Sequence, residues 1–180
     1  LVTAESPAPS GFDVASLAAA GFTGKRGTTH VVAGTPVTVL VGAGDDDLTL
    51  PSARDLGAAI ANSVAGATKI AVDVATLPID AKVAQGLVEG VLLARYSWDA
   101  LRAEPARSQV DAITILTPDS TPELTAGAQR GHVKALATCV SRDLSNCPPA
   151  HLTAVRWAAI AERVASDFGL GVEIADREWL

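Results

Sequence analysis

The chain has 180 residues and a net charge of −6, from 20 acidic and 14 basic residues. This length suits one α/β domain with a short extension, and the acidic balance disfavours nucleic-acid binding, which needs clustered Lys and Arg. Hydrophobic residues make up 48% of the sequence and aromatic residues only 4%, so we expect a folded core of Val, Leu, Ile and Ala. No apolar run approaches the roughly 20 residues of a membrane helix, and we expect a cytoplasmic protein without a membrane partner.

The first forty residues predict a lead-in, a short helix and a hairpin. Residues 1–11 are rich in Pro, Ser and Ala and are expected to be flexible. Residues 13–20 predict a short helix that ends at Gly21, because glycine suits the left-handed turn after a helix. Strand candidates at residues 28–33 and 37–41 flank a Gly-Thr-Pro turn, which predicts a hairpin. The second strand is apolar enough to be a central strand buried on both faces.

Helices and strands then alternate along the chain. Pro51 suits the first turn of a helix, in which apolar residues recur every four positions until Gly66 ends it. Residues 69–74 alternate between polar and apolar and predict a strand. Asp80 is placed to cap a long helix that we expect to run to about Arg102.

A third strand, expected to be buried, and a third helix follow at residues 112–116 and 122–140. This alternation of strands and helices predicts an α/β fold with a mostly parallel sheet that helices cover on both sides. The hairpin at its start adds an antiparallel strand, so the sheet should be mixed. We assign residues 12–140 to this N-terminal α/β domain.

The last forty residues predict a linker and the opening of a second domain. Residues 141–153 carry two consecutive prolines and are predicted to be the interdomain linker. An apolar helical stripe at residues 157–168 and a strand at 172–174 follow, so residues 154–180 form a helix–strand extension with too little apolar surface to fold alone. Because the sequence contains no methionine, we interpret it as a processed or excised piece. We assign a structural role in the linker to Arg142, Asp143, Asn146, Pro148 and Pro149. We expect Arg142 and Asp143 to form an ion pair.

The residues themselves predict no catalytic, metal-binding or cofactor-binding constellation. Gly42-Ala43-Gly44 follows an apolar strand, as in a phosphate-binding loop, but the aspartates at residues 45–47 would repel a phosphate. Solvated turn residues are the better interpretation of that aspartate triplet. The remaining candidates lie apart and fit no zinc pattern: His30, His132, His151, Cys139 and Cys147.

Four blocks of the sequence carry a resemblance to known proteins. The first is residues 21–27 (GFTGKRG) with the strands that follow them, and the second is residues 89–99 (EGVLLARYSWD), similar to E-G-x-x-L-x-x-Y-x-F-D with Trp98 in place of Phe. Residues 141–153 (SRDLSNCPPAHLT) resemble A-R-D-L-V-N-T-P-P-N-x-L-T, and residues 169–174 resemble G-L-x-V-E-V. In this order and spacing, the blocks resemble the leucyl aminopeptidase family, the two-metal cytosolic aminopeptidases.

The resemblance implies a macro-domain-like, three-layer αβα domain joined by the linker to a C-terminal metallopeptidase domain, of which residues 154–180 would be the truncated start. Members of the family form hexamers and remove N-terminal residues from peptides with two divalent ions, Mn or Zn. The family signatures that hold the metals and catalytic groups, V-G-K-G and N-T-D-A-E-G-R, do not occur here. Both metals are therefore expected in the missing catalytic domain, and we predict that the chain alone is inactive.

The leading hypothesis is a non-catalytic N-terminal domain of a leucyl aminopeptidase, which serves assembly and access to the active site. Its expected partners are its own catalytic domain, further copies in a hexamer and, through the parent protein, peptide substrates. The alternative is a stand-alone macro-like module that binds a nucleotide or another small ligand near Gly42 to Asp45. DNA binding is a third hypothesis, which the net charge disfavours.

Overall fold

The computed structural model describes residues 12–104 and 109–179, so the predicted lead-in at residues 1–11 lies outside the described part. The chain divides into two compact units, Leu1–Cys139 and Val140–Leu180. The first unit holds nearly all of the secondary structure, and the second contains the end of one helix and a further helix.

The first unit begins with the predicted short helix and hairpin. Helix α1 (Val14–Ala19) starts because Asp13 accepts a hydrogen bond from the amide of Ser16, and it ends before Gly21, which has a φ of 80°. Strands β1 (Thr29–Val32) and β2 (Thr38–Val41) then pair antiparallel. Both the helix and the hairpin confirm the sequence prediction.

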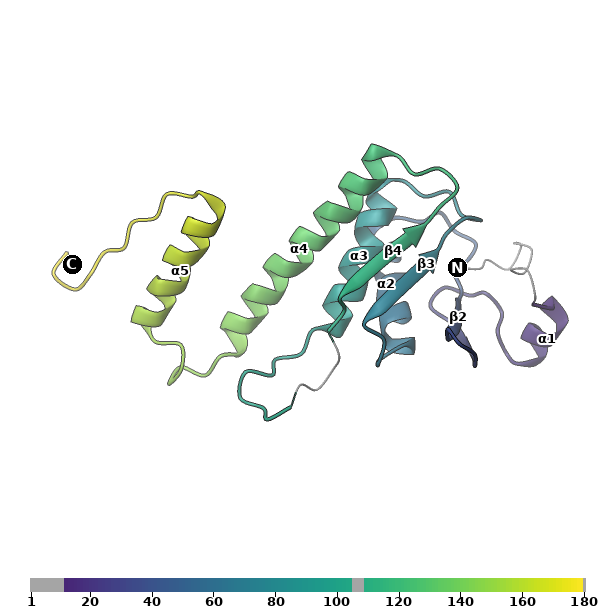
Figure 1. The fold of residues 1–180 in the computed structure, drawn as a ribbon, viewed down its shortest axis with the longest axis horizontal. Helices are drawn as coiled ribbons and strands as arrows, with labels where there is room; N and C mark the ends of the chain where they lie inside the picture. The colour runs from purple at the N-terminus through teal and green to yellow at the C-terminus, as the bar shows by residue number, and fades with distance from the viewer. Residues whose placement is uncertain (1–11, 105–108, 180) are drawn as a thin grey trace. The chain divides into compact units, whose positions relative to one another are not determined.

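The α/β part of the unit follows in the predicted order (Figure 1). Helix α2 (Leu50–Ser63) leads to β3 (Lys69–Asp73), and α3 (Ala81–Arg95) leads to β4 (Ala112–Leu116). Strands β3 and β4 lie side by side and point the same way, in a parallel pair with Ile70 opposite Ile113. Helix α4 (Pro122–Asn146) comes next.

Helices α2 and α3 pack closely together and bury one face of β3. Leu56 of α2 and Leu87 of α3 are at most 1% exposed and share a core cluster with Ile70 and Val72, the two inward residues of β3. At Gly90 the helix backbones approach so closely that a Cβ atom would overlap the carbonyl group of Arg54. The predicted amphipathic pattern of both helices is therefore confirmed.

The sheet differs from the prediction of one mixed, mostly parallel sheet. The described strands form two separate two-stranded sheets, β1–β2 and β3–β4. The central position expected for β2 is not found among the described strands, where β2 pairs only with β1. The expected burial on both faces holds at the end of the strand, where the successive residues Leu40 and Val41 are 4% and 2% exposed. Strand β4, expected to be buried, is half-covered, since it has one neighbour in the described sheet and Leu116 is 48% exposed.

Two helix ends also differ from the prediction. Helix α3 ends at Arg95 and not near Arg102, because Tyr96 is extended and Ser97 donates its hydroxyl to the carboxylate of Asp99 in a local turn. Helix α4 runs past residue 140 to Asn146, six residues into the predicted linker. It stops only where Pro148 disfavours helical backbone at the residue before it.

The second unit contains the end of α4 and helix α5 (Ala154–Phe168). Thr153 caps α5 at its start and Gly169, with a φ of 64°, caps it at its end, which confirms the predicted helix. The strand expected at residues 172–174 does not form: these residues are exposed, and no strand of the described chain pairs with them. Without a hydrogen-bonded neighbour, an apolar alternation does not make a strand.

Candidate functional site

The predicted linker residues lie at the turn between α4 and α5, within the second unit. Arg142, Asp143 and Asn146 are exposed residues in the last turns of α4, and Pro148 and Pro149 follow directly. The backbone carbonyl of Asp143 accepts a hydrogen bond from the amide of Cys147 at 3.0 Å. The linker is thus half helix and half turn.

Pro148 organises that turn through its carbonyl oxygen. The oxygen accepts hydrogen bonds from the amides of His151 and Leu152, at 2.8 and 2.9 Å. Helix α5 then starts at once, because the hydroxyl of Thr153 accepts from the amide of Arg156, and the Arg156 guanidinium donates to the carbonyl of His151 at 2.8 Å. Each bond joins residues at most five positions apart, so the turn is encoded locally.

A cavity of about 420 Å³ lies beside this turn. None of its lining residues carries an ionisable side chain. Two of its hydroxyl groups form hydrogen bonds within helices: that of Ser145 donates to the carbonyl of Ser141 in α4, and that of Thr153 caps the start of α5. The cavity is lined by Ser141, Leu144, Ser145, Leu152, Thr153, Ala154 and Trp157. This arrangement suits packing of an apolar group better than acid–base chemistry.

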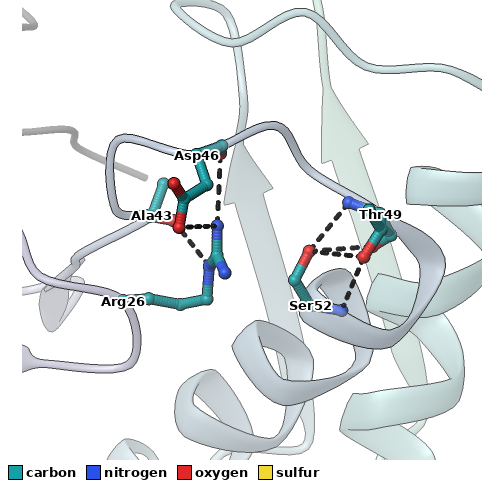
Figure 2. Close-up of polar contacts among 5 residues, drawn as sticks. All are labelled: Arg26, Ala43, Asp46, Thr49 and Ser52. Carbon is teal, nitrogen blue, oxygen red and sulfur yellow. Dashed lines mark hydrogen bonds and ion pairs between the residues drawn. The ribbon is translucent and has the colours of Figure 1, made fainter.

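The glycine-rich loop after β2 contacts the turn before β1 (Figure 2). The Arg26 guanidinium donates from Nε to the carbonyl of Ala43 at 3.1 Å and from a terminal nitrogen to the carbonyl of Asp46 at 3.2 Å. A Cβ atom at Gly42 would overlap the carbonyl groups of Gly24 and Lys25. Close approach between two segments of the chain therefore explains the glycine, without a bound phosphate.

The three aspartates of that loop are exposed to solvent, as the sequence predicts. Asp46 has a carboxylate oxygen 4.0 Å from the Arg26 guanidinium, and its side chain is 92% exposed. Such a pair contributes little to stability. Helix α2 starts just beyond the loop with a reciprocal cap, in which Thr49 and Ser52 each bond the other's backbone amide (Figure 2).

The histidines and cysteines lie in different surroundings in the structure. His30 is half-buried and lies 6.3 Å from the ring of Phe22, whereas His132 and His151 are exposed. Cys139 and Cys147 are free thiols. In residues 12–104 and 109–179, no group of three or more His, Cys, Asp or Glu side chains could hold a metal ion.

A buried polar network between α2 and α3 is the feature that the sequence analysis missed. Glu89 is only 3% exposed, and its carboxylate accepts from Arg54 Nε at 2.8 Å and from Gln85 Nε2 at 2.7 Å. The sequence signal was weak: a Glu and a Gln four residues apart within an apolar stripe. A charge of this kind stays buried only when it is paired and hydrogen-bonded.

Arg95 forms a second buried polar contact, at the other end of the same helix pair. Its guanidinium donates to the carbonyl of Val64 at 2.7 Å, to that of Ala67 at 2.6 Å, and to that of Ala65. These carbonyls belong to Val64, the residue that caps the end of α2, and to the turn that follows it. The first network joins α2 to α3, and the second joins α3 to the turn that follows α2.

The carboxyl group of Asp13 has a shifted pKa. Hydrogen bonds from the side chain of Ser16, and then from the amides of Ser16 and Ala15, lower the pKa of Asp13 from its ordinary value of 3.8. Asp13 is the exposed cap of α1, so this shift reflects helix capping.

No helix in the described ranges is long and apolar enough to cross a membrane.

Comparison with known proteins places these features in a family. The model of the N-terminal domain of the cytosol aminopeptidase family matches residues 11–105, more than half of the chain. A probable cytosol aminopeptidase from Rippkaea orientalis is 31% identical over 171 residues, which cover 88% of this chain and 34% of that protein. One from Rhizobium etli is 33% identical over 188 residues, covering 95% of this chain and 36% of the relative. The chain thus spans about a third of the length of these relatives.

Solved structures agree in fold. A tomato leucine aminopeptidase mutant superposes with a TM-score of 0.78 at 24% identity, covering 92% of this chain and 35% of that one. The bottromycin maturation enzyme BotP gives a TM-score of 0.77 at 25% identity, covering 94% of this chain and 37% of that enzyme. A further BotP structure, in complex with Mn, gives a TM-score of 0.74.

Proposed function

The chain belongs to the cytosol aminopeptidase family, and from that membership we propose that it acts as the non-catalytic N-terminal domain of a metal-dependent aminopeptidase that removes N-terminal residues from peptides. The observation that carries the proposal is the match of the family's N-terminal domain to residues 11–105. The resemblance of residues 141–153 to the family's linker supports it. We further infer that residues 12–140 are the domain and adopt the three-layer, macro-like arrangement.

We assign to this domain a role in assembly and in access to the active site of a neighbouring catalytic domain. The support is the apolar surface of α4 within residues 12–140: Val133 is 61% exposed and Leu136 is 49% exposed. A helix with apolar residues this open needs a partner surface to bury them. The partners we propose are the catalytic domain of the same protein and further copies in a hexamer.

The two divalent ions, Mn or Zn, are proposed to lie in the catalytic domain and not in these 180 residues. A two-metal site needs several ligands that converge on ions about 4 Å apart. The predicted role of Arg142, Asp143, Asn146, Pro148 and Pro149 is to set the geometry of the linker between the domains. The names of the relatives support a cytoplasmic location.

A chimera tests this function. The first third of the Rippkaea orientalis relative, the part aligned with this chain, is replaced by residues 1–180, and a matched variant of the relative lacks that third altogether. We expect the chimera to assemble as the parent does and to hydrolyse leucine p-nitroanilide with added Mn. The deleted variant should fail to assemble. A deletion variant that assembles and works as well as the chimera would refute the proposed role.

The isolated chain provides the second arm of the experiment. It should not hydrolyse leucine p-nitroanilide with Mn, and turnover that a chelator abolishes would refute its assignment as non-catalytic. Calorimetry with ADP-ribose separates the nucleotide-binding alternative, which requires micromolar binding. We expect none, because Arg26 and the loop carbonyls that would face a ligand already bond to each other.

A further inference from the structure

We draw no further inference here: the strongest candidate, the exposed apolar stripe of α4 that includes Val133, Leu136 and Val140, supports the assembly role already proposed, and nothing in the structure shows what covers it.

Discussion

Replacing the arginine of the Arg54–Glu89 pair should destabilise the chain more than neutralising the glutamate. Glu89 is 3% exposed, whereas the Arg54 side chain is 42% exposed. Arg54→Met therefore leaves a buried carboxylate whose remaining partner is the neutral amide of Gln85. Glu89→Gln leaves an arginine that water can solvate, and the new amide still offers an oxygen to it.

The expected magnitudes follow from this asymmetry. Removing one partner of a buried ion pair costs about 3–5 kcal/mol, and since Gln85 still donates a hydrogen bond, we expect Arg54→Met to lose about 3 kcal/mol. Glu89→Gln weakens hydrogen bonds without leaving a buried charge and should lose about 1–2 kcal/mol. The double variant Arg54→Met with Glu89→Leu should lose less than Arg54→Met alone, because apolar replacement of both charges removes the unpaired one.

Urea unfolding followed by far-ultraviolet circular dichroism measures these differences. The matched control is Lys82→Met on α3, which removes an exposed positive charge and should stay within about 0.5 kcal/mol of the wild type. An unchanged dependence on urea concentration in all variants would show that the unfolded state is comparable. Equal losses for the two single variants, or a larger loss for Glu89→Gln, would refute the reasoning.

Three further predictions concern helix packing, capping and pH. Gly90→Ala should destabilise by about 1–3 kcal/mol in urea unfolding, because its Cβ atom would overlap the backbone of Arg54, whereas Gly66→Ala, with open space around it, should change little. Thr49→Ala should lose about 1 kcal/mol in the same assay by removing the cap of α2. The pKa of Asp13 is lowered in the folded state, so its stabilising effect is present above pH 3.8 and is lost as the pH falls through the lower folded value. The unfolding midpoints of wild type and Asp13→Asn should therefore converge on acidification, and a constant difference would contradict this.

Signals that act over a few residues predicted most of the helices correctly. Asp80 accepts hydrogen bonds from the amides of Lys82 and Val83, as its place before an apolar helical stripe suggests. Gly169 ends α5 with a positive φ for the same kind of reason. In each case the capping residue and the backbone groups that it bonds are close in the sequence, so a short stretch of sequence is enough to predict the interaction.

Features that depend on distant residues were not predictable in this way. Arg54 and Glu89 are 35 positions apart, and the sequence around one residue does not indicate that the other is its partner. The alternation at residues 172–174 predicts a strand only if a neighbour exists, and none of the described strands takes that place. The same dependence explains β2: its apolar sequence suits a central position, but the structure provides a partner along one edge.

The residues that carry the family resemblance have structural explanations in this chain. In the block at residues 89–99, Glu89 is the buried partner of Arg54, and Gly90 allows α2 and α3 to approach. In the block at residues 21–27, Gly24 accepts from the amide of Gly44, and Arg26 bonds the loop after β2. These residues build the packing of the fold, so a chain can match the family here whatever its chemistry is. The catalytic assignment therefore depends on the chimera, and a chimera that folds and assembles but does not hydrolyse the substrate would separate the fold from the activity.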